Sequence, residues 1–595
     1  MPRHRAFAFR LTPWLPQALP PALSGMRAVR GAAALVTVAL LAGCTSTPLP
    51  PWPGGPVLGN VSKTMPNAPA PRPQQAAPSA PRPMPPAATP SPKLPPAAAP
   101  QPVVTPIPAV AVPNTTASGD LLAARFPVPA VVYQTPGLAP HRRALTTQAE
   151  LTDWIARLGA LPENARGTRA HPLALGNSAR GEPIVGVLIG RVANASPTSV
   201  DATGKPVIAL VGQQQGTDGA SAEALLHLAQ ELARGDLEPL LDRIHVLVVP
   251  RANPDGAAHH TAGTASGIAL DADHLALQTP EARALARVLS DYRAAVLVES
   301  REYDASQPYL EPWSLVGRAD ALVQYASPVN YPEFLRKAAA EWFAPALQQG
   351  LQAERLSSEP FHRLTGTTPQ APLDSDHLNP TRLVNAQALR NSIGLVVASR
   401  RTADPMQDLQ RRVHTQVVAI TAVLRQAAER AASLEQVRTF VARETSAQAC
   451  REPAVLRAEP RRERRDLTLL DPRTGAEQTV QVEWANGLAP QARETRTRPC
   501  GYWLAADNLR AVAQLRDLGL PVLRIAEPGS VLSEGQGLQR RAIDTPAGSY
   551  YAPLNHGLAL LTMAALEPVG QAPGNAPASV ARVLSPPALV FDETP

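Results

Sequence analysis

The stretch PVIALVGQQQGTDGASAEALL, residues 206–226, passes from one hydrophobic pattern to another within a few residues. Its first part is a short, continuous apolar run, which is typical of a buried β-strand, and its last part has apolar residues at helical spacing. The glycines and polar residues between the two parts predict a turn. A strand that leads through a turn into a helix is the unit from which α/β proteins with mostly parallel sheets are built.

The same alternation of strand and helix patterns continues on both sides of this stretch. Helices are predicted at 145–161, 221–235 and 279–293, and strands at 182–192, 205–213, 243–251, 294–302 and 394–400. Residues 404–444 predict a long helix or a pair of helices, and the residues beyond Cys450 predict shorter polar strands, with a strand and a helix at 501–520. We therefore expect an α/β domain over 121–445, with a mixed, mostly parallel sheet flanked by helices, and a small C-terminal α+β domain over 446–595.

The beginning of the chain has the features of a secretory signal. Met26 opens the sequence MRAVRGAAALVTVALLAGCTS, in which basic residues precede an apolar run and a group of small residues. Residues 41–44, LAGC, resemble the lipobox of bacterial lipoproteins, in which the cysteine is acylated. The apolar run of about 13 residues is shorter than the ~20 that span a bilayer, so a lipid on Cys44 is favoured over an uncleaved membrane helix. We expect a signal peptide over 1–44, with Met26 as an alternative start.

The amino-acid composition predicts a disordered linker after the signal peptide, and together with that signal it predicts where the protein is located. The 595 residues include 66 prolines, and over 45–120 proline, alanine, serine and glutamine leave no apolar periodicity, which predicts a disordered tether. The net charge of +7 comes from scattered arginines rather than a basic tract with aromatics, which argues against nucleic acid as a partner. The expected location is the bacterial cell envelope, in the periplasm, with the protein anchored to a membrane by lipid.

Two cysteines remain if Cys44 carries lipid. Cys450 and Cys500 are then an even number of thiols in an oxidising compartment, and a disulfide between them is the natural expectation. Two buried free thiols are the alternative, because the sequence does not give the distance between the side chains.

Several strings resemble those of the zinc carboxypeptidase family typified by carboxypeptidase A, in a bacterial secreted or lipoprotein branch. The most specific is PRANPDGA at 250–257, which looks like the Asn-Pro-Asp-Gly turn after the second core strand of that family. The segments IALDADH (268–274), VESREY (298–303) and RNSIGLVVASR (390–400) follow in the family's order. The resemblance covers roughly 126–400 and implies the family's α/β fold, a bound zinc ion and peptide hydrolysis.

The metal-binding positions of this family carry other residues here. The His and Glu of the family's metal-binding turn fall on Gln215 and Asp218, and its third ligand, a His, falls on Arg301. An acidic residue expected shortly before that His is Glu299. Zinc favours imidazole, carboxylate or thiolate ligands, and a guanidinium is a permanent cation without an acceptor. No bound metal is therefore expected, unless the chain is an atypical zinc enzyme.

The positions that would act on the substrate are also replaced. The family's general base, a Glu, falls on Ala398, and its substrate-binding Asn-Arg pair falls on Asp271 and Ala272. The arginine that helps to polarise the scissile carbonyl would lie near Ala262. Because a general base must accept a proton, alanine at this position removes that step. No catalytic residue is expected.

Arg301 suggests what replaces the metal. If its side chain enters the former zinc position, its charge stands in for that of the metal, and we expect an ion pair with Asp218, with Glu299 or Gln215 as further partners. The alternative is that Arg301 reaches solvent. In either case, the side chains expected to remain in the old cleft are Asp218, Arg301, Glu299 and Asp271.

A relocated metal site has few candidates. The nearest are His259 and His260 and the group Asp271, Asp273 and His274. Adjacent histidines on an extended segment point in opposite directions, so only one of the first pair would serve. Asp273 and His274 are expected to cap a helix or to face solvent.

These observations favour a pseudoenzyme. We expect an envelope lipoprotein with a zinc carboxypeptidase fold that binds a peptide, a peptidoglycan stem or an envelope protein without cleaving it. The competing hypothesis is an active metallocarboxypeptidase that binds zinc through atypical ligands, and a third is a structural envelope protein with a closed cleft. Accessibility around Asp218, Arg301 and Ala398 separates the first from the third.

Overall fold

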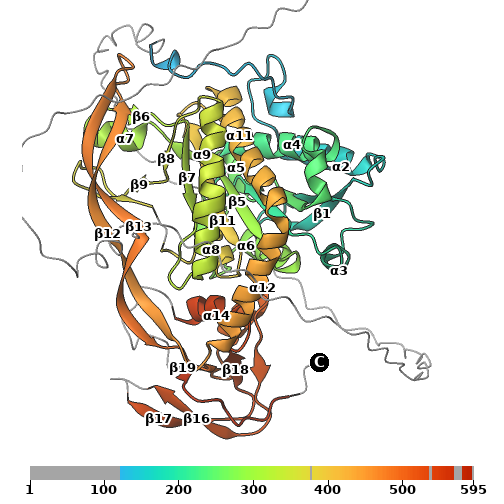
Figure 1. Ribbon diagram of the computed structural model, residues 1–595, viewed down its shortest axis with the longest axis vertical. Coiled ribbons are helices and arrows are strands. Elements are labelled where there is room, and N and C mark those ends of the chain that lie inside the picture. Colours follow the sequence, from blue (N-terminus) through green and yellow to red (C-terminus); the bar gives the residue numbers. More distant parts are fainter. Residues whose placement is uncertain (1–120, 376–377, 535–538, 568–578, 593–595) are drawn as a thin grey trace, which may run out of the picture. The chain divides into compact units, whose positions relative to one another are not determined.

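The computed structural model describes residues 121–375, 378–534, 539–567 and 579–592, all of which belong to the compact unit 107–595 (Figure 1). The predicted signal peptide, Cys44 and the predicted tether at 45–120 all lie outside these residues. Within the described residues, no helix combines the length and apolar character needed to cross a membrane.

An eight-stranded mixed sheet forms the centre of the fold, as predicted. In spatial order its strands are β1 (Arg169–Asn177), β2 (Pro183–Gly190), β4 (His245–Val249), β3 (Val207–Gly212), β5 (Val296–Asp304), β11 (Ile393–Arg401), β7 (Ala321–Tyr325) and β8 (Ser358–Pro360). The four strands from β4 to β11 are parallel, whereas β1, β2 and β7 run antiparallel to their inner neighbours. The carboxyl ends of the parallel strands therefore share one edge of the sheet.

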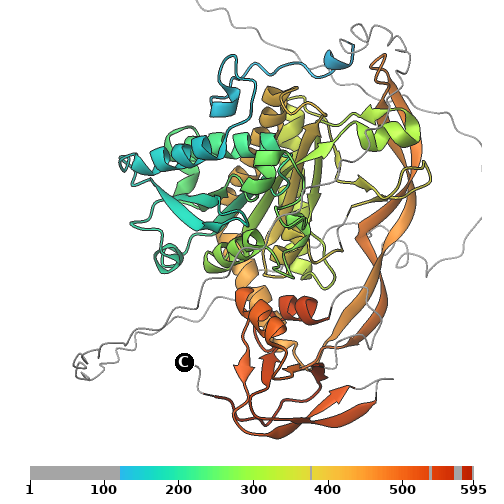
Figure 2. The same ribbon diagram turned by 180° about the vertical axis from the view of Figure 1, so that it is seen from behind.

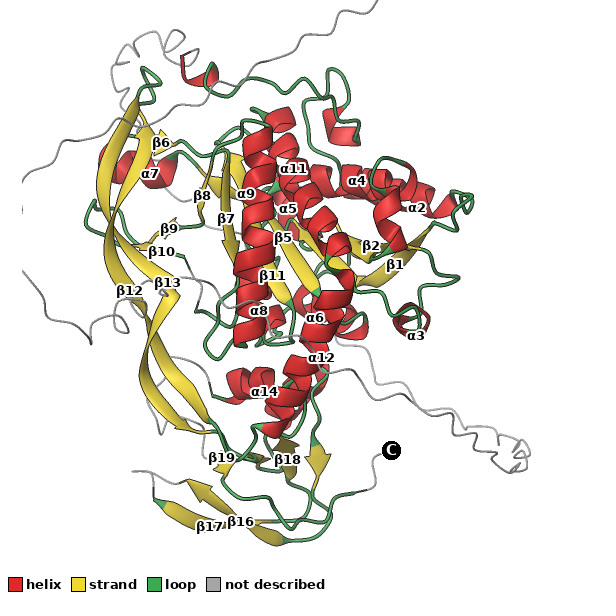
Figure 3. Ribbon diagram, in the orientation of Figure 1, coloured by secondary structure: helices red, strands yellow, loops and turns green. Residues whose placement is uncertain are grey.

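Helices flank this sheet (Figure 3). The helices of this part of the chain are α2 (Gln148–Ala160), α3 (Pro197–Asp201), α4 (Gly219–Arg234), α5 (Pro254–His259), α6 (Pro280–Asp291), α7 (Gln307–Trp313), α8 (Glu333–Ala338), α9 (Ala344–Ala353), α10 (Leu383–Ala388), α11 (Leu409–Glu429) and α12 (Ala431–Ala447). Two of them lie away from the sheet: α7 packs beside β6 (Val316–Gly317), and α12 packs against α8 and α14 (Ala559–Leu566). Their ends follow the sequence signals: Thr147 and Glu150 form a capping box at α2, and Gly235 caps the C-terminus of α4. The long helical pattern at 404–444 is a pair of helices that meet at Arg430.

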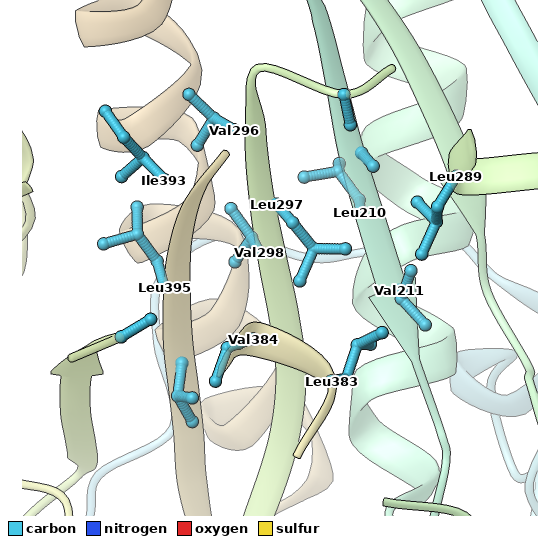
Figure 4. Packing of buried hydrophobic residues seen from close by; sticks show 14 of the residues in the cluster. Leu210, Val211, Leu289, Val296, Leu297, Val298, Leu383, Val384, Ile393 and Leu395 are labelled. Atoms are coloured by element: carbon cyan, nitrogen blue, oxygen red, sulfur yellow. The ribbon is translucent and has the colours of Figure 1, made fainter. Parts of the chain in front are cut away.

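The apolar core lies between the sheet and its helices. Figure 4 shows side chains of β3, β5 and β11 packed together with Leu289 of α6 and with Leu383 and Val384 of α10. The inner strands are buried on both faces, as in Leu210 and Leu297, which are 0% exposed. This burial explains why the inner strands appear in the sequence as continuous apolar runs rather than alternating ones.

A long β-hairpin follows α12 and was not predicted at this length. Strands β12 (Pro453–Leu470) and β13 (Glu477–Thr497) have 18 and 21 residues, so the expectation of shorter polar strands was wrong here. The hairpin is the centre of a five-stranded sheet with the short strands β6 (Val316–Gly317), β10 (Leu373–Asp374) and β9 (Arg363–Leu364). Figures 1 and 2 show it running from β6 to the C-terminal strands.

The last part of the chain forms a six-stranded sheet with two helices. Its strands, in spatial order, are β15 (Leu523–Arg524), β18 (Tyr550–Pro553), β14 (Gly501–Leu504), β19 (Val580–Val583), β16 (Gly529–Glu534) and β17 (Arg540–Thr545), and its helices are α13 (Leu509–Asp517) and α14 (Ala559–Leu566). A disulfide joins Cys450 to Cys500, across the base of the β12–β13 hairpin. Strand β14 and helix α13 lie where the pattern at 501–520 placed a strand and a helix.

Candidate functional site

The turn after β3 packs directly against the Asn-Pro-Asp-Gly turn after β4. A side chain at Gly216 would meet the backbone of Gly256 at 1.9 Å, so only glycine fits at this contact. Asn253, which is fully buried, caps α5 by accepting from the Gly256 amide at 2.9 Å and donates to the Gln214 carbonyl at 3.1 Å. The Asn253 side chain therefore fixes the turn that carries Gln214 and Gln215.

Arg301, which the sequence analysis matched to the family's third zinc ligand, lies on β5. Its Nη2 donates to Asp271 Oδ2 at 2.9 Å, and its Nη1 lies 3.4 Å from Glu299 Oε1. The guanidinium also lies over the ring of Phe361, 5.7 Å from the ring centroid. Because Arg301 is only 8% exposed, the alternative that it reaches solvent is wrong.

Asp271 collects donors from three different segments. Besides Arg301, it accepts from Arg382 Nη1 at 2.6 Å and from Gln215 Nε2 at 3.2 Å. It is held by a short 3₁₀ helix, Leu270–Ala272, and is 2% exposed. Burial by itself would raise the pKa of Asp271, but the guanidinium groups of Arg301 and Arg382 hold it below its usual value.

A second chain of hydrogen bonds supports Glu299. Gln214 Nε2 donates to Glu299 Oε1 at 2.6 Å, and the other amide atom, Oε1, accepts from His274 Nε2 at 2.6 Å. Burial raises the pKa of Glu299 and lowers that of His274 to about 4, so His274 is neutral and keeps its proton on Nε2 at neutral pH. These contacts fill the space between the turn after β3 and strand β5.

Asp218 does not take part in this ion-pair network. The predicted pair between Arg301 and Asp218 was wrong, because the two side chains form no contact within the 4.0 Å that defines an ion pair here, whereas Asp271 and Glu299 both reach the guanidinium. Asp218 is 1% exposed, and its Oδ2 has no hydrogen-bond partner among the described residues. Burial raises its pKa to about 7, against the attraction of Arg301.

Ala398 lies beside Arg301. The two residues are Cα partners in the parallel pairing of β11 with β5, and Ala398 is 0% exposed. The structure therefore places Ala398, which we matched to the family's general base, next to Arg301, which we matched to its third ligand. A methyl group at this point accepts no proton.

The side chains at these positions do not fit a zinc ion. Among the described residues, no group of three or more His, Cys, Asp or Glu side chains is arranged to hold a metal. The side chain of Gln215 is a neutral amide, and that of Arg301 is a cation paired with Asp271, so neither is a ligand that zinc favours. The residues considered for a relocated site have other partners: His259 contacts Arg180, Asp273 accepts from Thr279, and His274 donates to Gln214.

The sequence analysis missed Gln214 and Arg382 as members of the network, and it considered His274 only as a candidate metal ligand. Gln214, His274 and Arg382 contribute buried hydrogen bonds or an ion pair, and none belongs to a family motif position that we matched. Gln214 and His274 lie next to matched positions, so a search for buried polar neighbours would have found them. Arg382 precedes α10 and is one arginine among many, without a local signal.

Comparison with known proteins agrees with the resemblance. The model of the zinc carboxypeptidase family matches residues 161–268. Carboxypeptidase 2 of Trichophyton tonsurans is 22% identical over 411 residues, covering 63% of this chain and 74% of that protein, and carboxypeptidase 2 of Trichophyton rubrum is 23% identical over 408 residues, with the same coverage. Residues 161–268 therefore match the zinc carboxypeptidase family, which is normally zinc-dependent.

Solved structures with a related fold include two carboxypeptidases. The metallo-carboxypeptidase of Burkholderia cenocepacia is 15% identical to this chain, with a TM-score of 0.35, and the match covers 47% of this chain and 68% of the Burkholderia chain. Carboxypeptidase A of Helicoverpa armigera is 13% identical to this chain, with a TM-score of 0.37, and the match covers 53% of this chain and 80% of the Helicoverpa chain.

Proposed function

We propose that this chain is a lipid-anchored protein of the bacterial cell envelope that retains the zinc carboxypeptidase fold without hydrolysing peptides. One observation carries the proposal: at the position of the family's third zinc ligand, the guanidinium of Arg301 is ion-paired with Asp271 at 2.9 Å. A catalytic zinc needs protein ligands and an open position for water. A guanidinium held by two carboxylates supplies no ligand and occupies the space.

The remaining side chains supply no substitute chemistry. Ala398 has no acceptor, and Asp218 is 1% exposed, so its carboxyl group is shielded from a substrate. General-base catalysis requires the base to lie within hydrogen-bond reach of the proton it removes. Neither residue meets this requirement.

A ligand would therefore meet the rim of the old site rather than its interior. Asp218, Arg301 and Ala398 are all buried, as the closed-cleft alternative expects for the interior of the site, whereas Gln215 and Thr217 of the same turn are half-buried. An amide and a hydroxyl at the rim suit hydrogen bonds to the backbone of a peptide. We propose that the bound partner is a peptide, a peptidoglycan stem or an envelope protein.

The anchor is part of the same proposal. The LAGC sequence at 41–44 follows an apolar run and precedes a proline-rich tether, which is the arrangement of a lipoprotein. Metabolic labelling with an alkyne fatty acid is expected to label the full chain and not the Cys44→Ser variant. Equal labelling of both proteins would contradict a lipid on Cys44.

The decisive experiment measures zinc content and peptide hydrolysis on the same preparation. We expect the wild-type protein to bind no stoichiometric zinc after incubation with excess metal and dialysis, and to leave C-terminal peptide bonds intact. Stoichiometric zinc, together with hydrolysis that is lost in Asp218→Ala, would instead establish an active metallocarboxypeptidase.

A variant with the family's residues tests the positional matches. The combination Gln215→His, Asp218→Glu, Arg301→His and Ala398→Glu is expected to gain zinc binding, because it restores two imidazoles, a carboxylate and a base at one edge of the sheet. The matched control keeps Arg301 and changes the other three positions. If the control binds zinc as tightly as the full variant, Arg301 is not what excludes the metal.

Binding is tested separately from hydrolysis. Co-sedimentation with purified peptidoglycan sacculi, and with peptide-coated beads, is expected to retain the wild-type protein and to be weakened by Gln215→Ala with Thr217→Ala. If the protein is retained on neither material and captures no envelope protein, the hypothesis of a purely structural envelope protein is favoured.

A further inference from the structure

A cavity lies at the other edge of the central sheet. Because β3, β5 and β11 are parallel, their amino ends share one edge, and Val207, Ala294 and Asn391, at or just before these ends, line a cavity of about 470 Å³. From the amino end of β5 to Arg301 the strand rises by about 16 Å, since each residue adds about 3.3 Å. The cavity is thus separate from the former metal position, and its volume is in the range of small-molecule sites.

Arg390 is a buried cation without an acidic partner in this cavity. It is 9% exposed, and the one side-chain hydrogen bond it makes among the described residues runs from Nη2 to the Leu518 carbonyl at 2.7 Å. No acidic side chain of the described residues lies within ion-pair distance of it. Burial lowers the pKa of Arg390 to about 10, which still leaves it charged at neutral pH.

Gln387, one helical turn before Arg390, also lines the cavity. It is 3% exposed, and its side-chain amide has no hydrogen-bond partner within the described part of the chain. Buried polar groups are nearly always paired with protein, water or ligand atoms. An unpaired amide and an uncompensated guanidinium facing the same cavity indicate that something else completes both.

Two other cations of the cavity have acidic partners. Arg438 pairs with Glu435 at 2.8 Å and donates to the Arg293 carbonyl at 2.7 Å, while Arg293 pairs with Asp201. Lys205, which also lines the cavity, donates to the Leu241 carbonyl at 3.0 Å, so Lys205 and Arg390 are the two lining cations that bond a main-chain carbonyl rather than a carboxylate. The lining also holds the carboxylate of Asp291. Of the two cations, Arg390 is the one with a guanidinium.

The C-terminal segment supplies one wall of the cavity. Asn391 Nδ2 donates to the Gly557 carbonyl at 2.8 Å, and a side chain at Gly557 would meet Ala442 at 2.9 Å. Gly519, with φ of 68°, adopts a backbone conformation that other residues rarely take and lines the same wall. The close approach of these glycines to the carboxypeptidase domain gives the cavity its shape.

We propose that this cavity binds a small molecule bearing a carboxylate or phosphate group, with Arg390 and Gln387 as the residues that bind the anion. The planar guanidinium offers a fork of donors that matches two oxygens of either group. The Gln387 amide adds a neutral donor at the same site. The site is independent of whether the former metal position binds a peptide.

The test is calorimetric titration of the full chain at constant ionic strength, with inorganic phosphate in one arm and succinate in the other. We expect saturable binding in at least one arm, and the arm that binds identifies the anion. Arg390→Gln is expected to weaken that binding at least 10-fold, and Arg390→Lys less, because an ammonium keeps the charge without the fork. Arg464→Gln, which removes an exposed arginine of β12, is the control and is expected to bind as the wild type does.

Two results would overturn the proposal. One is the absence of saturable binding in both arms, and the other is unchanged affinity in Arg390→Gln. If Arg390→Gln does not fold, Gln387→Ala replaces it, and its affinity for the bound anion is expected to fall several-fold. Unchanged affinity in that variant would equally contradict the site.

Discussion

The two edges of the central sheet each hold a buried arginine, and the two arginines differ in their partners. At the carboxyl edge, Arg301 lies 2.9 Å from Asp271 and 3.4 Å from Glu299. At the amino edge, Arg390 has a main-chain carbonyl at 2.7 Å and no acidic side chain within ion-pair distance among the described residues. The same side chain therefore completes an internal network at one edge and leaves a charge available at the other.

The difference in partners should change how much each arginine contributes to the free energy of unfolding. Removing one partner of a buried ion pair leaves the other charge in a poorly solvating environment, at a cost of about 3–5 kcal/mol. Removing a buried charge that has no partner avoids this cost. Equivalent substitutions at the two edges should consequently have unequal effects on stability.

The largest effect is expected for Arg301→Met. This change leaves Glu299 buried without its cation, and it leaves Asp271 with one of its two arginines, Arg382, and the neutral Gln215 amide. We expect it to lower the free energy of unfolding by about 3–5 kcal/mol in urea titrations at pH 7. Arg464→Met, at an exposed position of β12, is the control and is expected to stay within about 0.5 kcal/mol of the wild type. A loss below about 1 kcal/mol for Arg301→Met would show that the network is not coupled to the fold.

An intermediate effect is expected from Asp218 and depends on pH. Its pKa rises from about 4 in the unfolded chain to about 7 in the folded protein because of burial, while Arg301 and Arg401 oppose and Glu302 adds to this rise. The folded state thus binds the extra proton between these values, and stability falls as pH rises toward 7. Relative to Asp218→Asn, the wild type should lose about 2–3 kcal/mol between pH 5 and pH 8.

This pH dependence is read from urea titrations of both proteins at several pH values. The difference between the two free energies of unfolding should change up to about pH 7 and be constant above it. Parallel curves over the whole range would mean that Asp218 is charged in the folded protein at pH 5 and has an unrecognised partner.

The smallest effect is expected for Arg390→Met. Without added anion, its free energy of unfolding should lie within about 1 kcal/mol of the wild type, because a charge without an acidic partner is removed. When the anion that the wild type binds is added, the wild type should gain stability by mass action and Arg390→Met should not. A loss as large as that of Arg301→Met would remove the distinction between the two edges.

The fold was predictable because its signals are local and repeated. Continuous apolar runs at β3, β4 and β5 and the caps at α2 and α4 specify buried strands between helices, and the structure confirms the mixed sheet with flanking helices. The β12–β13 hairpin was missed in length because much of it is exposed. An exposed ribbon has no continuous apolar run that would mark its extent.

The candidate site was predictable in position and only partly in contacts. Gln215, Asp271, Arg301 and Glu299 do come together, because strand order and register place them at one edge. The pairing of Arg301 was assigned to Asp218, since the sequence shows which segments meet but not which carboxylate reaches first. The walls of the Arg390 cavity come from segments as far apart as Val207 and Gly557, so no local pattern indicates it.

The disulfide has a consequence for handling the protein. Cys450 and Cys500 flank the whole hairpin, whose turn includes Arg473, with 82% of its side chain exposed. Trypsin cleavage after Arg473 would leave the two fragments covalently joined, so a nicked sample would run as the intact chain on a non-reducing gel. Only a reducing gel would separate the fragments, and purity should be judged from both.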